Sequence, residues 1–155
     1  EAAKRVEREF HGTIPLDRAT LDSFPGIGNA TAGAVVVFST NRPEIFIETN
    51  IRRVYIHLFF PDAPRVHDRE IVPILEETLD RDRPREIYYA LMDYGYLLKG
   101  RAGNPNTRSA SYARQSPFRG SDRQVRGILL RQLLDHREMC EEDVRDLVHV
   151  QPDRL

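Results

Sequence analysis

The chain has 155 residues, enough for one hydrophobic core and at most a small second lobe. Its 23 Lys and Arg residues nearly balance 24 Asp and Glu residues, so the net charge of -1 neither indicates nor excludes a nucleic-acid partner. No apolar run approaches the roughly 18 residues that cross a bilayer, no signal peptide is evident, and a single Cys140 gives no disulfide framework. We therefore expect a soluble, cytoplasmic protein with no membrane partner.

The N-terminal part of the chain predicts three helices. The first covers residues 2–10 and ends before Gly12, and Asp17 is a suitable N-cap for a short second helix that reaches Phe24. Residues 29–39 (NATAGAVVVFS) predict the third helix, because Gly33 and the alanines interrupt the β-branched run; a strand is the alternative. The expected core residues of this part are Leu16, Leu21 and Phe24.

Two glycines in four positions connect the second and third helices. The sequence Pro25-Gly26-Ile27-Gly28 permits a tight turn with positive φ, which indicates a helix-hairpin-helix. The N–H groups at the start of the third helix lack intrahelical acceptors, and the helix dipole there favours an anion such as a phosphate. The alternative is a glycine turn with a structural role alone.

Residues 50–60 predict a helix that Glu48 or Thr49 caps, with an apolar face made by five residues: Ile51, Val54, Tyr55, Leu58 and Phe59. Further helices are expected over 68–79, over 84–99, from Ser121 to about His136, and over 141–148. The helix that begins at Pro84 ends before Gly100 and Gly103.

Charge is distributed unevenly over the C-terminal third. Residues 99–131 contain eight basic residues and only one acid, Asp122, whereas acids outnumber bases by seven to three in residues 132–155. Arginines mixed with Tyr112 and Phe118 are typical of a surface that binds nucleic acid, where the arginines neutralise phosphates and the aromatic rings stack on bases. The alternative is an ordinary solvated surface.

The glycine turn and the segment around Glu48, taken with the distance between them, resemble the pattern of a known family. PGIGNATAGA, followed twenty residues after Gly28 by ETNIRRV, is similar to the helix-hairpin-helix DNA glycosylases, the superfamily of endonuclease III, the adenine glycosylase MutY and the archaeal thymine-mismatch glycosylases. The stretch ALMDYG at residues 90–95 looks like a segment of the MutY branch. In that family the hairpin holds the DNA backbone and the acidic residue at the head of the next helix is catalytic, a role that the resemblance assigns to Glu48.

The sequence departs from the family pattern at three places. Glu48 stands where the family usually has aspartate, and Ala30 stands where the strand-cleaving branch has the Schiff-base lysine. Cys140 alone cannot replace the four cysteines that hold an iron–sulfur cluster in many members. We therefore expect no strand cleavage, no iron–sulfur cluster and no other metal; the resemblance allows a monovalent cation at the hairpin. The chain begins at Glu1 inside a helical pattern, and the resemblance implies that the first half of the glycosylase domain precedes it.

Cleavage of an N-glycosidic bond builds positive charge on the sugar, which a fixed carboxylate stabilises. Glu48 is the expected catalytic residue; the alternative is an N-cap or surface glutamate. Arg52 and Arg53 are expected at phosphates, or else on a solvated face. The complete set of residues expected to contact DNA is Pro25, Gly26, Ile27, Gly28, Asn29, Ala30, Thr31, Asn50, Arg52, Arg53, Arg108, Arg114 and Arg119.

The sequence thus predicts an all-α protein. Residues 1–111 are expected to form the C-terminal part of a helix-hairpin-helix glycosylase domain, and residues 112–155 a small basic helical region, for which a winged-helix-like form is one option. The expected activity is that of a monomeric, monofunctional DNA glycosylase of base excision repair, acting on duplex DNA with adenine or thymine mispairs. A non-catalytic DNA-binding module is the alternative, and a helical interaction domain without DNA contact is a third.

Overall fold

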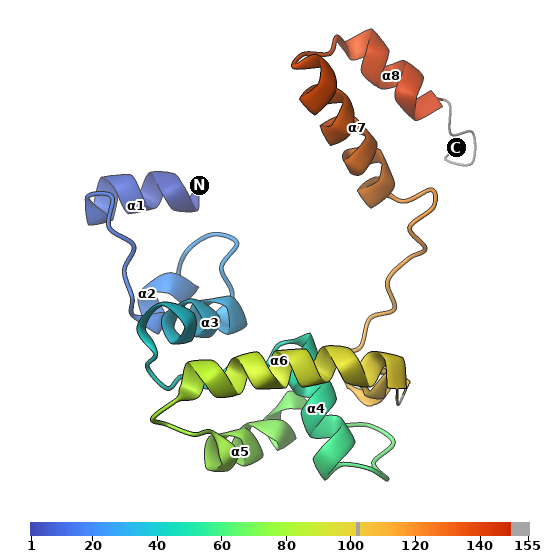
Figure 1. Cartoon of the computed structure of the whole chain (residues 1–155). Coiled ribbons are helices and arrows are strands. Elements are labelled where there is room, and N and C mark those ends of the chain that lie inside the picture. The colour runs from blue at the N-terminus through green and yellow to red at the C-terminus, as the bar shows by residue number, and fades with distance from the viewer. Residues whose placement is uncertain (102, 150–155) are drawn as a thin grey trace. The chain divides into compact units, whose positions relative to one another are not determined.

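A computed structural model describes residues 1–101 and 103–149, and the side chains of residues 1–101 and 103–145. The chain divides into two compact units, Glu1–Tyr112 and Ala113–Leu155 (Figure 1). The described residues of both units are helical, which confirms the predicted all-α class, and none of their helices has the length and apolarity of a bilayer span. Residues 150–155 of the predicted C-terminal region lie outside the described residues.

The first unit begins with three helices whose positions match the prediction. Their bounds are Ala2–Phe10 for α1, Arg18–Asp22 for α2 and Asn29–Thr40 for α3. Asp17 caps α2, since its Oδ1 accepts a hydrogen bond from the Thr20 N–H at 2.8 Å. This bond lowers the pKa of the Asp17 carboxyl. The alternative of a strand over the Ala- and Val-rich stretch is wrong.

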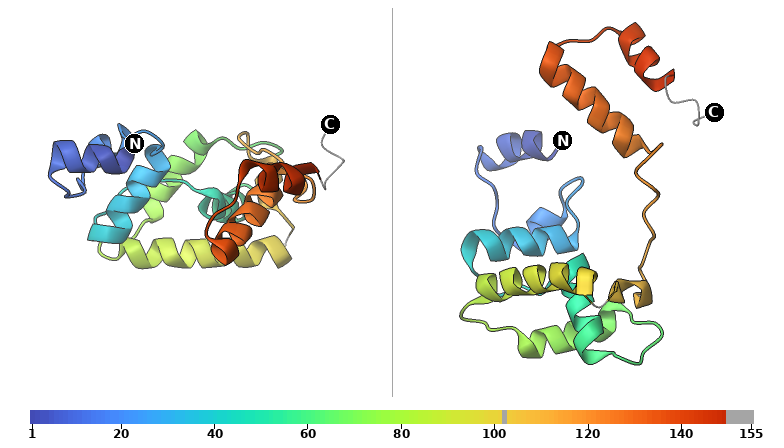
Figure 2. Two further views of the ribbon diagram at one scale, coloured as in Figure 1. Left: turned by 90° about the horizontal axis from the view of Figure 1, so that it is seen from above. Right: turned by 45° about the vertical axis from the view of Figure 1, so that its right-hand side comes forward.

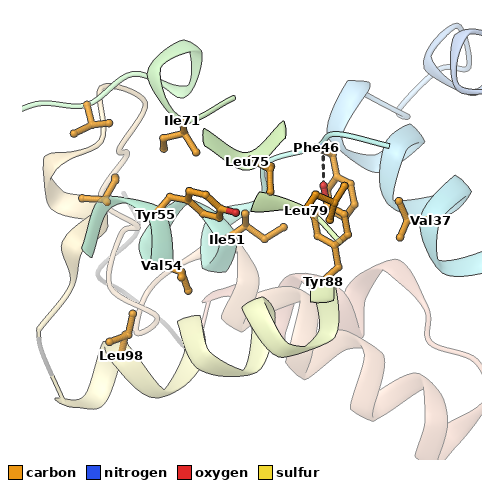
Figure 3. Close-up of a cluster of buried hydrophobic side chains, with 12 residues drawn as sticks. Val37, Phe46, Ile51, Val54, Tyr55, Ile71, Leu75, Leu79, Tyr88 and Leu98 are labelled. Atoms are coloured by element: carbon orange, nitrogen blue, oxygen red, sulfur yellow. Dashed lines mark hydrogen bonds between the residues drawn. The ribbon is translucent and has the colours of Figure 1, made fainter. Parts of the chain in front are cut away.

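The remaining elements of this unit are α4 (Thr49–Phe59), α5 (Asp68–Thr78), α6 (Pro84–Arg101) and a short 3-10 helix, η1 (Pro105–Arg108). Helix α6 runs beside α3 and α4 (Figure 2), and α4 packs against α5 and η1 as well. The core lies between these helices and contains the predicted Ile51, Val54 and Tyr55 of α4 (Figure 3). One isolated parallel β-bridge joins Val66 to Ser109 within the described residues.

Three residues predicted in the core are exposed instead. Leu16 precedes the N-cap of α2 and is 41% exposed, and its carbonyl accepts a hydrogen bond from Arg42. Leu58 and Phe59 occupy the last turn of α4 and are 52% and 45% exposed. The helical period continues through this turn, where the Phe59 ring stacks on Tyr55 of its own helix with 5.3 Å between centroids.

The second unit consists of α7 (Asp122–His136) and α8 (Glu141–His149). The sequence Ser121-x-x-Gln124 predicts a capping box, and its N-cap bond is present: Ser121 Oγ accepts from the Gln124 N–H at 3.4 Å. Gln124 Oε1 accepts from the Gly120 N–H, so the reciprocal bond of the predicted capping box is displaced by one residue. The helical spacing of Val125, Leu129 and Leu133 predicts that Leu133 faces inward, but it is 43% exposed, because a pair of helices has too little surface to enclose both sides of α7.

Tyr88 fixes the extended segment that leads from α3 to α4. Its hydroxyl donates to the Glu44 carbonyl at 2.8 Å and accepts from the Phe46 N–H at 3.3 Å. Its ring stacks on Phe46 with 4.1 Å between centroids (Figure 3). Burial raises the pKa of Tyr88 to about 12.

We expect the protein to lose stability as the pH rises from 10 to 12. Unfolded Tyr88 ionises near 10.0 whereas the folded residue keeps its proton to about 12, so the folded state binds more protons across this window. Each pH unit then costs at most about 1.4 kcal/mol. Tyr88→Phe should lower the free energy of unfolding at pH 7 by about 1–2 kcal/mol and flatten the slope between pH 10 and 12. Urea denaturation at several pH values measures both quantities. If stability fell equally with pH between 10 and 12 in the wild type and in Tyr88→Phe, Tyr88 would not be the group responsible.

Candidate nucleic-acid interface and active site

The loop between α2 and α3 presents an uncapped helix N-terminus. Gly26 has a φ of +83°, as predicted for a tight turn, and Gly28 is the extended N-cap residue of α3. Among the described residues, no side chain caps α3, and a Cβ built on either glycine meets nothing within 4 Å. The first-turn N–H groups of α3 therefore lack both intrahelical and side-chain acceptors, the arrangement that suits a phosphate.

Seven of the residues predicted to contact DNA lie in the hairpin at positions 25–31. Five of these are exposed: Pro25, Gly26, Gly28, Asn29 and Thr31. Ile27 instead packs against the buried cluster of Leu21, Ala32 and Val36, so it anchors the turn. The Asn29 side chain also faces the protein, because its Oδ1 accepts from Arg18 Nη2 at 2.6 Å. The side chain of Ile27 is thus turned into the protein, while the DNA contact of the exposed Asn29 stays a prediction.

Arg18 joins the hairpin to the segment before α4 and was missed by the sequence reasoning. In addition to Asn29, its guanidinium pairs with Glu44 at 3.2 Å. Arg18 and Ala30 line a pocket of about 540 Å³ together with residues of α4 and α5, including Arg52 and Asp68. No motif marks Arg18, since both partners lie many positions away in the sequence.

Glu48 caps α4, as the sequence predicted. Its Oε1 accepts from the Asn50 N–H at 2.7 Å and from the Ile51 N–H at 3.0 Å. Its Oε2 lies 3.5 Å from the Asn50 amide nitrogen and forms no ion pair within the described residues. The carboxylate is therefore held by one oxygen at the positive end of a helix, while the other oxygen has a single weak contact.

The hairpin helix packs directly on the segment that carries Glu48. Gly33 of α3 is buried, and a Cβ added there would lie 3.0 Å from the Phe46 Cβ, two residues before Glu48. The pocket next to this contact is lined by Asn29 and Ala30 on one side and by Ile47 and Arg52 on the other. Small side chains in α3 thus bring the hairpin helix against Phe46, two residues before Glu48, while Glu48 itself is not among the residues that line this pocket.

Arg53 differs from the prediction, because it is only 5% exposed. Its Nη1 donates to the Gly95 carbonyl at 2.6 Å and to Asn50 Oδ1 at 2.7 Å, and its Nε donates to Asn104 Oδ1 at 3.3 Å. A buried guanidinium with these acceptors cannot reach a phosphate. The DNA contact predicted for Arg53 is therefore wrong, because its guanidinium links α4 to the Gly95 carbonyl of α6. The contact predicted for Asn50, which is only partly buried, stays a prediction.

Arg52 is also engaged within the protein. Its Nε and Nη2 donate to the two carboxylate oxygens of Asp68 at 2.6 and 2.7 Å, which is a bidentate pair. The hydrogen bond to Asp68 raises the pKa of Arg52, burial opposes this, and the charge of Glu48 adds to it. The charge of Glu48 thus acts on Arg52, which forms a salt bridge between α4 and α5, and its predicted phosphate contact stays a prediction.

Arg108 caps the C-terminal end of α4 instead of binding a phosphate. Its guanidinium donates to the carbonyls of Phe60, Pro61 and Ala63, and Nη2 donates to the Ile56 carbonyl at 3.3 Å. These carbonyls have no intrahelical donors or follow the helix end, so the cation satisfies them. Arg114 and Arg119 are exposed in the segment before α7, where they stay predicted DNA contacts.

The fold and the open glycine turn define an all-helical protein with a helix-hairpin-helix. No protein-family model matches the chain. It is 32% identical over 151 residues to the adenine DNA glycosylase of Mycolicibacterium smegmatis, covering 87% of this chain and 52% of that protein. It is 30% identical over 97 residues to the thymine/uracil-DNA glycosylase of Pyrobaculum aerophilum, covering 59% of this chain and 42% of the relative.

Endonuclease III of Bacillus subtilis is 31% identical over 84 residues, which cover 54% of this chain and 36% of that enzyme. The homologues of this chain are therefore DNA glycosylases and endonuclease III, which is consistent with the superfamily that its motifs predicted. The chain spans about half the length of the first of these relatives and less of the other two.

Proposed function

We propose that the full-length protein is a monofunctional DNA N-glycosylase that binds duplex DNA and removes a mispaired or damaged base. The observation that carries this proposal is the Glu48 carboxylate, fixed at the N-terminus of α4 two residues after Phe46, against which the hairpin helix packs at Gly33. Homology to adenine, thymine/uracil and endonuclease III enzymes supports the reaction class.

In the proposed reaction the target nucleotide is flipped out of the duplex and its deoxyribose lies against Glu48. As the N-glycosidic bond breaks, positive charge develops on the sugar, and the carboxylate stabilises it. Two N–H bonds to Oε1 hold the group in one orientation, while Oε2 orients or deprotonates the attacking water. The products are the free base and an abasic site.

Cleavage of the strand is not part of the proposal, because Ala30 offers no amine at the position that the family uses for a Schiff base. The protein should convert lesion-bearing duplexes to products that break only after alkali, and borohydride should trap no covalent complex. A panel of adenine, thymine, uracil and oxidised-base mispairs identifies the substrate. Adenine and thymine mispairs are expected first. Absence of alkali-labile product across the panel would refute the proposal.

A non-catalytic DNA-binding module is the second candidate, and a specific observation favours it: Glu48 replaces the family aspartate and serves as the N-cap of α4. A glutamate that only caps a helix would leave DNA affinity intact without turnover. Tight binding that does not distinguish intact from mispaired duplexes, together with no excised base, would favour this candidate.

The proposed DNA contact of the hairpin can be tested by replacing Gly26, whose positive φ suits glycine. Gly26→Ala should weaken binding to duplex DNA about tenfold, or 1.4 kcal/mol, because a Cβ at a φ of +83° is strained and turns the N–H groups of α3. Gly12→Ala is the matched control, since Gly12 has a φ of +79° with nothing within 4 Å and lies outside the hairpin. Fluorescence anisotropy with labelled duplex measures both; an equal loss in the two variants would remove the hairpin from the interface.

A further inference from the structure

Asn106 is buried under the first turn of α4. It lies in η1 and is 4% exposed, and its amide Nδ2 donates to the Thr49 carbonyl at 2.8 Å. Its Oδ1 is buried and has no hydrogen-bond partner among the described residues. A segment 57 positions further along the chain therefore contacts the residue that immediately follows Glu48.

A second asparagine reaches the same turn from the same segment. Asn104 Oδ1 accepts from Arg53 Nε at 3.3 Å, and Arg53 Nη1 in turn donates to Asn50 Oδ1 at 2.7 Å. The backbone N–H of Asn50 is one of the two donors that hold Glu48 Oε1. Two independent contacts thus run from residues 104–106 to the turn that carries the carboxylate.

The unpaired Oδ1 shows that Asn106 is not optimised for packing. A buried acceptor without a donor is unfavourable, whereas an apolar side chain would leave no such atom. The favourable contribution of the amide is its bond to the Thr49 carbonyl. Because Thr49 is the first residue of α4, this bond restrains the turn in which the Asn50 and Ile51 N–H groups face Glu48.

We propose that Asn106 is a positioning residue for Glu48: it fixes the first turn of α4 and thereby the orientation of the carboxylate. The catalytic part of this inference rests on the proposed function, while the structural part does not. Displacement of a catalytic group by about 1 Å can lower a rate up to about 100-fold. A loosened turn should therefore reduce excision without reducing DNA affinity.

The test compares Asn106→Ala with Ser109→Ala in the full-length protein. Ser109 is likewise a buried polar residue of this segment, at 8% exposure, but its hydroxyl contacts Ser111 and not α4. Amide hydrogen exchange by NMR reports the first turn directly. The Asn50 and Ile51 amides should exchange about tenfold faster in Asn106→Ala, while α6 core amides keep their rates and Ser109→Ala changes neither.

Single-turnover excision should fall at least about fivefold in Asn106→Ala at unchanged DNA affinity. Unchanged exchange at Asn50 and Ile51, or an equal rise across the whole unit, would overturn the inference. If the wild type excises no base, the exchange rates still decide the role of Asn106 and only the proposed function fails. Should Asn106→Ala not fold, Asn104→Ala removes the parallel contact to Arg53 and should raise the same two exchange rates.

Discussion

Glu48→Gln should lower the single-turnover rate of base excision by about 10²- to 10⁴-fold and leave affinity for duplex DNA within about twofold. The amide keeps the shape of the side chain and an oxygen that can accept from the Asn50 and Ile51 N–H groups, so α4 remains capped. What it loses is the negative charge that stabilises the developing sugar cation. Quenched-flow assays with a mispaired duplex and anisotropy titrations measure the two quantities separately.

Glu48→Asp is the matched variant, because it keeps the charge, shortens the side chain by one methylene and restores the family residue. We expect it to excise bases at a rate within about tenfold of the wild type, since aspartate is also a good N-cap. Equal excision by Glu48→Gln and the wild type would exclude a catalytic carboxylate at this position. Glu48 would then be only the N-cap at the start of α4.

Gly95→Ala should produce the largest loss of stability among single-methyl changes in α6. A Cβ on Gly95 would lie 2.4 Å from the Asn50 carbonyl oxygen and 2.7 Å from the Asn50 Cβ, closer than any real contact. Movement of α6 away from α4 disturbs the bond from Arg53 to the Gly95 carbonyl, and movement of Asn50 disturbs its bond with Arg53. We expect the free energy of unfolding to fall by about 1–3 kcal/mol or more, together with a slower excision rate.

Gly100→Ala is the control for this effect. It lies in the same helix, but a Cβ there meets nothing within 4 Å. Alanine lowers the conformational entropy of the unfolded chain and should stabilise the helix by about 0.5–1 kcal/mol. Thermal and urea unfolding of the two variants compare them directly. Equal stability in both would mean that α6 and α4 are not closely packed in solution.

The sequence predicted those features of the fold and site that depend on neighbouring residues. Asp17 and Glu48 were expected as N-caps because cap chemistry involves only the next three residues, and both side chains have these bonds. The turn at Gly26 and Gly28 was similarly expected from local backbone freedom, and Gly26 has the required positive φ. Resemblance added the relation between the hairpin and Glu48, which no periodicity could provide.

The hydrogen-bond partners of the arginines could not be predicted, because these partners are distant in the sequence. Arg52 pairs with a residue 16 positions away, Arg53 with the Gly95 carbonyl 42 away, and Arg108 with the Phe60 carbonyl 48 away. A sequence shows an arginine beside a DNA-binding motif but not the carbonyls that the fold brings to it. The stretch ALMDYG at residues 90–95 indicated a resemblance to the MutY branch, but only the structure shows that its glycine, Gly95, packs against Asn50.

The contacts of residues 104–110 also determine the order in which the first unit can be completed. Asn106 bonds to Thr49, Arg108 covers the end of α4, and Ser109 bridges Val66, all across more than forty intervening residues. A polypeptide made from its N-terminus forms the hairpin from local contacts early, whereas these closures must wait for this segment to leave the ribosome. A nascent chain that stops before residue 104 therefore contains the hairpin but lacks the contact of Asn106 with the first turn of α4.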